Sequence, residues 1–357
     1  MIVVRWNCSN AAWRKAGDVT EPGHCELFFS TNLVSLALAT KIDVHVELEL
    51  ELRGAPSPPS LREVETEFGT CLRVDWPEGD DLTGACRDLP ALDEVALRQL
   101  EWVRGIGPKT STLLRKRGAT TLVHLARSSS KWGDQARELL ACFRDRKLRE
   151  LCRRRGVREL PLLGRVGRGG LVFLDVEATG FYGSPVIALG AGTFDGDRFT
   201  VTQFVSRRFV EEAATCAAFL DFVRSMSGPR ALVSYNGKGY DAPVLRERCF
   251  YYFDVDPLHP GENGAFDLHV DLFHELRRLS TPRPSDYRLG TLEREVLGSG
   301  DGRAEDLPSH AIPAAYQRFV DGKPGSGRLM GRVLQHNRAD VVALPLLLDL
   351  VVRMTLS

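Results

Sequence analysis

The chain has 357 residues, 43% of them hydrophobic and 26% charged, which is the composition of a globular protein with about two or three domains. No apolar run is long enough to span a bilayer, and the N-terminus lacks the regions of a signal peptide, so we expect a cytoplasmic protein with no membrane segment. Eight cysteines without a CxxC pair favour reduced core thiols in a cytosolic protein of this size. A zinc site at Cys8, His24 and Cys25 is the weaker alternative.

We predict a small strand-rich domain over residues 1–92, for which the sequence indicates no activity. In residues 41–53, Ile, Val and Leu alternate with polar side chains, and this period of two is typical of a half-buried antiparallel strand. Residues 71–76 have the pattern of a partner strand. Between the two strands, the Pro and Ser residues of segment 54–60 predict a loop.

The formal net charge is zero, but the charge is unevenly distributed. Residues 98–168 contain 19 Lys and Arg against 6 Asp and Glu. Such a basic segment in a neutral protein favours contact with a polyanion over an ordinary solvated surface. We expect a basic helical region over residues 93–165, with one basic helix over residues 130–165, and then a glycine-rich hinge at residues 164–170.

Two short helical patterns flank a glycine-rich turn in this basic region. The sequence VRGIGPKTSTLL of residues 103–114 resembles a helix-hairpin-helix nucleic-acid-binding motif. Its glycines permit a tight turn, and the first backbone amides of the following helix can bind a phosphate. The resemblance implies nucleic-acid contacts from Gly105, Gly107, Lys109, Arg115 and Lys116. The alternative is a helical hairpin that serves packing alone.

Residues 166–357 have an α/β pattern. Three strand patterns follow one another, and afterwards helices alternate with single short strands. This order predicts a mixed sheet flanked by helices, with an antiparallel three-strand meander followed by parallel crossovers. The predicted strands cover residues 171–178, 184–194, 198–205, 231–236 and 268–273, with helices at 211–226, from 241, and at the C-terminus.

The first of these strands ends with two carboxylates, Asp175 and Glu177. Side chains alternate along a strand, so both project to the same face, where they repel each other. A divalent cation would remove this conflict, and hard oxygen ligands suit Mg²⁺ or Mn²⁺. The alternative is a strand end whose acids face water.

Further candidate ligands follow later strands and lie on the last helix. Asp241 begins the helix after the fourth strand, where it would also serve as an ordinary N-cap. His336 and Asp340 are four residues apart and therefore share one face of a largely apolar helix. A buried Asp is costly without a partner, which a metal would supply. A histidine satisfied within the core is the alternative for His336.

Three motifs occur in the order that one family shows. LDVEATG, NGKGYD and HNRAD resemble the motifs of the DEDD (DnaQ-like) 3′→5′ exonucleases, which have the ribonuclease-H-like fold. Residues 168–355 are most similar to the predicted YprB-type exonucleases of that superfamily, including the segments HVDLFHELRR and YRLGTLEREVLG. The resemblance implies hydrolysis of phosphodiester bonds from 3′ ends of DNA or RNA, single-stranded or otherwise 3′-ended.

The resemblance also implies roles for individual residues. Four carboxylates would hold two Mg²⁺ or Mn²⁺ ions: Asp175, Glu177, Asp241 and Asp340. His336 would be the general base, although superfamily members with a catalytic His usually have four residues before the last Asp, and this chain has three. Asn236 and Lys238 would contact the nucleotide, Asp271 would support the site, and Tyr235, Tyr240 and Phe181 would stack on bases or pack in the core.

Two other functions remain open from the sequence. A ribonuclease-H-type endonuclease shares the fold, but it would not need His336 before Asp340. A nucleic-acid-binding protein that keeps the fold without catalysis would not need all four acids. No feature of the sequence separates DNA from RNA as the substrate, since nothing identifies a pocket for the 2′-hydroxyl.

Overall fold

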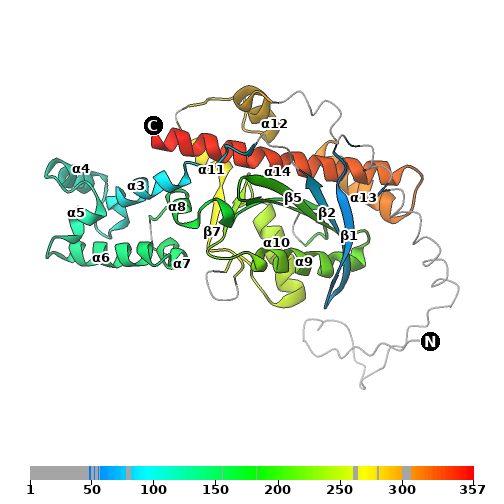
Figure 1. Cartoon of the computed structure of the whole chain (residues 1–357), viewed down its shortest axis with the longest axis horizontal. Helices are drawn as coiled ribbons and strands as arrows, with labels where there is room; N and C mark the ends of the chain where they lie inside the picture. The colour runs from blue at the N-terminus through cyan, green and yellow to red at the C-terminus, as the bar shows by residue number, and fades with distance from the viewer. Residues whose placement is uncertain are drawn as a thin grey trace, which may run out of the picture. The chain divides into compact units, whose positions relative to one another are not determined.

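A seven-stranded mixed sheet forms the centre of the computed structural model (Figure 1). The structure describes residues 48–49, 52, 55, 57–77, 82–154, 156–181, 183–259, 264–279, 281–299 and 307–357, all of which belong to the unit Ile42–Ser357. The strand order is β1-β2-β5-β4-β3-β6-β7. The strands are β1 (Ser60–Thr66), β2 (Gly69–Pro77), β3 (Leu171–Ala178), β4 (Val186–Asp195), β5 (Arg198–Val205), β6 (Ala231–Ser234) and β7 (Leu268–Asp271).

The sheet has an antiparallel half and a parallel half. In the antiparallel half, β1 pairs with β2, β2 with β5, β5 with β4, and β4 with β3. In the parallel half, β3 pairs with β6 and β6 pairs with β7. This arrangement confirms the predicted meander with parallel crossovers, and every predicted end of these five strands lies within two residues of the observed end. Its helices are α9 (Glu212–Ser225), α10 (Asp241–Phe253), α11 (Leu272–Arg278), α12 (Leu289–Leu292), α13 (Ile312–Val320) and α14 (Ser326–Leu356).

Helices cover both faces of the sheet, and the alternation of β3 divides its apolar side chains between two cores. Val172 and Leu174 pack in the core shared with α9 and α10, whereas Leu171 and Phe173 pack in the core shared with α13 and α14. Figure 1 shows α14 running along one side of the sheet and α9 and α10 on the other. By the period of two, Asp175 and Glu177 face the α14 side with Leu171 and Phe173.

Helix α14 approaches the sheet closely because two positions on β4 have no side chain. A Cβ at Gly192 would lie 2.4 Å from the Phe199 ring and 2.7 Å from the Val341 side chain. A Cβ at Gly190 would lie 2.2 Å from Oδ1 of Asn337 on α14. Glycine at 190 and 192 is therefore a packing requirement, and it sets the height of α14 above β3 and β4.

The basic segment is helical, as predicted, but it contains several short helices. These are α3 (Leu92–Leu97), α4 (Pro108–Lys116), α5 (Leu122–Ala126), α6 (Lys131–Arg144), α7 (Leu148–Cys152) and α8 (Leu163–Val166). The single basic helix predicted from residue 130 is wrong, because the chain turns after Arg144. Arg146 has a positive φ of 55°, a conformation incompatible with a continuing right-handed helix.

Short 3-10 and π segments connect the longer elements. They are η2 (Leu89–Ala91), η3 (Leu100–Trp102), η4 (Leu160–Leu162), η5 (Arg168–Gly170), η6 (Phe209–Glu211), η7 (Glu293–Leu297) and η9 (Ser309–Ala311). The predicted glycine-rich hinge falls on α8 and η5, so it is regular structure. A Cβ at Gly164 would lie 2.4 Å from Asp93, and one at Gly170 would lie 2.3 Å from the Pro229 carbonyl oxygen. These two glycines allow close packing of the basic segment and do not form a loose linker.

The strand predicted over residues 41–53 is also wrong where the structure describes it. Leu48, Glu49 and Leu52 are helical, and both leucines are fully buried. Leu and Glu are strong helix formers, and a spacing of four places Leu48 and Leu52 on one helical face. A sequence of alternating Leu and Glu therefore has leucines at a helical spacing as well as at a strand spacing. Burial of the face that carries Leu48 and Leu52 favours the helix.

The predicted partner strand, residues 71–76, is confirmed within β2. It pairs with β1 on one side and with β5 on the other, from Leu72 opposite Val205 to Pro77 opposite Thr200. The β1–β2 hairpin therefore extends the central sheet and is not part of a separate strand-rich core. The domain boundaries near residues 92 and 165 remain predictions.

The predictions about cysteines, zinc and membrane helices concern residues that the structure describes only in part. The cysteines among them are free thiols, and Cys152 alone is not fully buried: Cys71, Cys86, Cys142, Cys152, Cys216 and Cys249. The possible zinc site at Cys8, His24 and Cys25 lies outside the described residues. A membrane-crossing helix would need a longer apolar stretch than any helix of the described part offers.

The glycine contact under α14 gives a test of the fold. We expect Gly192→Ala to lower the free energy of unfolding by about 1–3 kcal/mol, because the new methyl group must displace the Phe199 ring and Val341. The matched control is Gly169→Ala, where a Cβ meets no atom within 4 Å. Equal thermal unfolding midpoints for the two variants would contradict the packing described here.

Candidate active site

The predicted acidic residues lie on β3 and on two helices that contact it, α10 and α14. Asp175 and Glu177 lie on β3, Asp241 begins α10, and Asp340 lies on α14. The Asp241 carboxylate reaches the strand directly, since its Oδ1 accepts a hydrogen bond of 2.8 Å from the backbone N–H of Val176. Asp241 therefore links the start of α10 to β3, and its side chain is buried, with 5% of the residue exposed.

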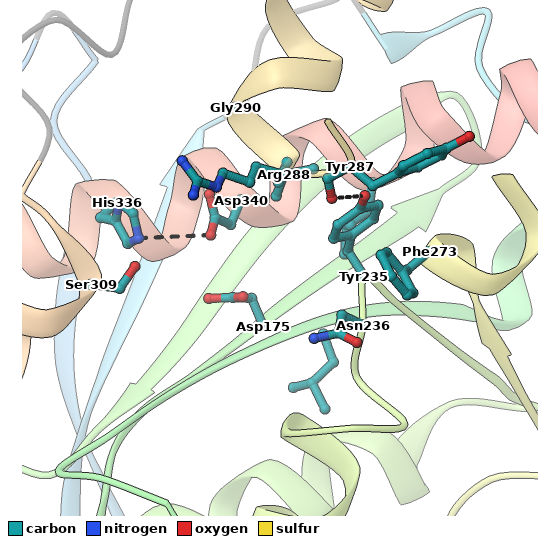
Figure 2. Close-up of a pocket in the computed structure, with 13 residues that line it drawn as sticks. Asp175, Tyr235, Asn236, Phe273, Tyr287, Arg288, Gly290, Ser309, His336 and Asp340 are labelled. Carbon is teal, nitrogen blue, oxygen red and sulfur yellow. Dashed lines mark hydrogen bonds and ion pairs between the residues drawn. The ribbon is translucent and has the colours of Figure 1, made fainter. Parts of the chain in front are cut away.

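His336 and Asp340 stand one turn apart on α14 and point toward β3 (Figure 2). The His336 Nε2 and the Asp340 Oδ2 are 3.8 Å apart. Together with Asp175 they line a cavity of about 450 Å³ beside α14. The structure thus brings the first and third predicted motifs to one cavity, with a histidine beside two carboxylates.

The carboxylates influence one another electrostatically. Burial, followed by the charges of Asp340, Glu177 and Asp241, raises the pKa of Asp175 well above its usual range. Burial also raises the pKa of Asp241 to about 7, against hydrogen bonds from backbone amides that lower it. The ionised forms of these carboxylates therefore repel one another, and burial makes ionisation still less favourable.

This donor set fits a divalent cation by its chemistry. Among the described residues, no three Asp, Glu, His or Cys side chains already stand close enough to enclose one ion. Yet the buried carboxylates have the hard oxygen ligands that Mg²⁺ and Mn²⁺ prefer, and their mutual repulsion is what a cation would relieve. Asp175, Glu177, Asp241 and Asp340 are the residues that would hold such an ion.

Asp271 organises the loop that connects β6 to α10. It caps α11 through the Phe273 N–H, and it accepts hydrogen bonds from the backbone N–H groups of Asn236 at 3.0 Å and Lys238 at 2.9 Å. The helix cap considered for Asp271 is therefore present, and its supporting role in the site stays a prediction. Asn236 has a left-handed φ of 57°, which these bonds help to hold, and its side chain lines the cavity.

Two further residues of the same loop are fixed by their neighbours. A Cβ at Gly237 would lie 2.2 Å from the Ser234 hydroxyl and 3.1 Å from Asp241, so this position requires glycine. The Lys238 ammonium group forms an ion pair of 2.7 Å with Glu159 of the basic segment. Lys238 was predicted to contact a phosphate, and in this structure its charge is directed to Glu159.

Aromatic side chains form part of the cavity wall. Tyr235, Phe273 and Tyr287 line it, and the Tyr235 hydroxyl donates a 2.5 Å hydrogen bond to the Tyr287 carbonyl (Figure 2). Tyr240 lies near the acids, where its hydroxyl donates to the Gly180 carbonyl and its ring meets Phe181 edge-on. Phe181 is 76% exposed, so its ring is accessible to a ligand.

The predicted hairpin residues lie in the basic segment, around the turn between η3 and α4. Gly105 has a φ of 91°, which favours glycine, whereas Gly107 precedes α4 in an extended conformation. Lys109 and Lys116 are exposed on α4. The Arg115 guanidinium instead donates to the carbonyls of Arg98 and Thr120, so it ties α4 to the rest of the segment.

Sequence reasoning missed several residues of the site. Asn337, adjacent to His336, donates hydrogen bonds to the backbone oxygen and Oδ2 of Asp175, at 3.0 and 2.7 Å. Its signal in the sequence was a lone Asn inside an apolar helix, a position where a side chain needs a partner. Tyr287 and Arg288 also line the cavity. They begin the segment YRLGTLEREVLG that the family resemblance includes, but no spacing rule assigned them to the site.

Comparison with known proteins places the α/β part of the chain. Residues 172–352 match the family model of the RNase H superfamily. The uncharacterized protein YprB of Bacillus subtilis (strain 168) is 36% identical over 180 residues, which are 50% of this chain and 40% of that protein. The family B DNA polymerase from the hyperthermophilic archaeon Pyrobaculum calidifontis is similar over 49% of this chain and 23% of the polymerase, with 20% identity and a TM-score of 0.37. The chain thus spans less than half the length of either protein.

The raised pKa of Asp241 predicts how stability depends on pH. In metal-free protein, folded Asp241 keeps its proton up to about pH 7, whereas the ordinary value is 3.8. The folded state binds the extra proton between these values, so its stability falls as the pH rises from about 4 to about 7. We expect Asp241→Asn to flatten this slope, measured as unfolding midpoints with a chelator present. The exposed Asp221→Asn is the control, and an unchanged slope in Asp241→Asn would contradict the assignment.

Proposed function

The chain belongs to the RNase H superfamily, and from this premise we propose that it is a metal-dependent 3′→5′ exonuclease of the DEDD type acting on DNA or RNA. The observation that carries the proposal is the meeting of Asp175, Asp340 and His336 at one cavity, with Glu177 and Asp241 close enough to affect the charge of Asp175. Crowded carboxylates beside a histidine are suited to hydrolysis of a phosphodiester bond.

The chain's own residues divide the work. Asp175, Glu177, Asp241 and Asp340 would hold two divalent cations, which supply an activated water and stabilise the leaving oxygen. Asp241 also fixes the geometry of β3, because its Oδ1 is occupied by the Val176 N–H. Asn236 lines the same cavity and is held by Asp271, so its side chain is in place to contact a nucleotide.

His336 is the general base in this proposal. Its imidazole is 11% exposed and lines the cavity that Asp175 also lines, so a water there is within the reach of both. After taking a proton, the imidazolium would be stabilised by Asp340, whose Oδ2 is 3.8 Å away. The three-residue gap between His336 and Asp340 places both on one helical face, which this pairing requires.

The basic segment would hold the substrate strand beside the site. Three ion pairs tie residues 149–159 to the sheet and its neighbours: Arg149 with Asp267, Glu159 with Lys238, and Arg158 with Glu275. Lys238 belongs to the loop that leads to Asp241, so the segment is attached next to the acids. A polyanion bound along it would end near the cavity.

Loss of the first carboxylate tests catalysis. With Mg²⁺ or Mn²⁺ and end-labelled DNA and RNA, single- and double-stranded, we expect shortening from the 3′ end. Asp175→Asn should reduce the rate by more than about 100-fold, because even groups that only support metal ligands are worth about 10–100-fold. Asp221→Asn on α9 is the matched control, an exposed acid away from the cavity.

The pattern of products separates the proposal from its rivals. Internal cuts on hybrids would indicate a ribonuclease-H-type endonuclease. Binding without degradation of any substrate, by wild type and Asp175→Asn alike, would indicate a non-catalytic nucleic-acid-binding protein.

Exposed lysines of the hairpin test substrate binding. The double variant Lys109→Ala/Lys116→Ala should bind single-stranded nucleic acid more weakly. The slope of log K against log salt should become shallower by about 0.7 for each phosphate that the variant no longer neutralises. Lys323→Ala, an exposed lysine before α14, is the control. Binding and slope equal to those of wild type would exclude the hairpin as the site that binds phosphate.

A further inference from the structure

A chain of buried polar side chains connects the β1–β2 hairpin to Asp175. The Trp76 indole on β2 donates to Oε1 of Gln203 on β5 at 2.7 Å, and Nε2 of Gln203 donates to Oδ1 of Asn337 on α14 at 2.7 Å. Asn337 completes the chain by donating to Oδ2 and to the backbone oxygen of Asp175. Trp76 is 2% exposed, and Gln203 and Asn337 are fully buried. Water therefore does not compete for these bonds.

The indole determines the direction of every bond in this chain. Trp can only donate through Nε1, so it requires the oxygen of the Gln203 amide to face it. The Gln203 nitrogen must then face Asn337, and it donates there and to the Leu334 carbonyl, at 2.8 Å. Asn337 must turn its oxygen toward Gln203, which leaves its NH₂ group for Asp175. A residue 99 positions before Asp175 thus sets which atoms the carboxylate meets.

The packing around Asn337 prevents other arrangements. Gly190 lies directly beneath it, since a Cβ there would be 2.2 Å from Oδ1 and 2.9 Å from the side-chain carbon of the amide. Gly190 pairs with Asp175 across β3 and β4, so the glycine, the amide and the carboxylate are stacked at one point of the sheet. The amide therefore has one position and one orientation.

We propose that Asn337 is a positioning residue for Asp175, and that Gln203 and Trp76 fix the orientation of its amide. By holding one carboxylate oxygen and the backbone oxygen of the same residue, Asn337 limits rotation of the Asp175 side chain and directs it toward a bound cation. The inference rests on the proposed function, because it concerns the residue assigned there as a metal ligand. It also gives the β1–β2 hairpin, which lies outside the matched residues 172–352, a part in the site.

The test measures Mn²⁺ affinity directly, by titration calorimetry or by the electron paramagnetic resonance signal of the free ion, on the full chain without substrate. Asn337→Leu removes the donor to Asp175, and we expect at least tenfold weaker Mn²⁺ binding, the effect typical of groups that orient metal ligands. Gln203→Leu leaves the Asn337–Asp175 contact but removes the group that orients it. We expect a smaller loss in the same direction.

The control is Thr215→Val, on α9. It removes another fully buried hydrogen bond, the 2.9 Å bond from the Ser206 hydroxyl, without touching the chain from Trp76 to Asp175. We expect it to lower the unfolding midpoint and to leave Mn²⁺ affinity within twofold of wild type. This separates a positioning role from a general loss of stability.

The outcomes distinguish failure of the inference from failure of the proposed function. If wild type binds Mn²⁺ and Asn337→Leu binds it equally well, Asn337 is structural only and the inference is overturned while the function stands. If Asn337→Leu does not fold, Gln203→Leu decides in the same way. If wild type does not bind Mn²⁺ at all, the metal-dependent function fails and the inference fails with it.

Discussion

Repulsion between carboxylates at the α14 face of β3 is the constraint that the rest of the structure accommodates. Asp175 is buried beside Asp340, Glu177 and Asp241, and together these raise its pKa well above the usual range. Bringing several carboxylates together in a buried place is costly, since each ionised group disfavours the ionisation of the others. A divalent cation bound among them would offset this cost, as the proposed function requires.

Several features of the chain hold these acids together against their repulsion. The Val176 N–H binds Asp241, and Asp271 ties the loop before α10 to α11. Glycines at positions 190 and 192 let α14 lie close to the sheet, which brings Asp340 over β3. These contacts use backbone amides and close packing, so they add no positive charge of their own.

The attachment of the basic segment has a similar logic. Its ion pairs with Asp267, Glu275 and Lys238 join it to the edge of the sheet at β7 and α11, next to the loop that leads to Asp241. Under the proposed function, one part of the chain would bind the phosphate backbone and the adjacent part would cleave it. The ion pair between Glu159 and Lys238 links the two parts near the acids, because Lys238 lies only three residues before Asp241.

What the sequence determined by itself was everything that depends on short spacing. The strands from Leu171 to Val205, the common face of Asp175 and Glu177, and the shared face of His336 and Asp340 follow from periods of two and of about four. The same reasoning failed at Leu48, Glu49 and Leu52, where the pattern of Leu and Glu is compatible with a strand and with a helix. It also failed after Arg144, where the reversal of the chain depends on one backbone angle. Local pattern does not resolve either case.

Tertiary structure alone decided which distant residues complete the site. Trp76, Gln203 and Asn337 meet because β2 joins β5 in the sheet and because glycines let α14 settle on β4, and neither pairing is encoded in a local period. Tyr287 and Arg288 also reach the cavity through the tertiary fold, more than a hundred residues after Asp175 in the sequence. A short motif specifies which atoms are available, whereas the orientation of a carboxylate depends on hydrogen bonds from residues that only the folded chain brings into contact.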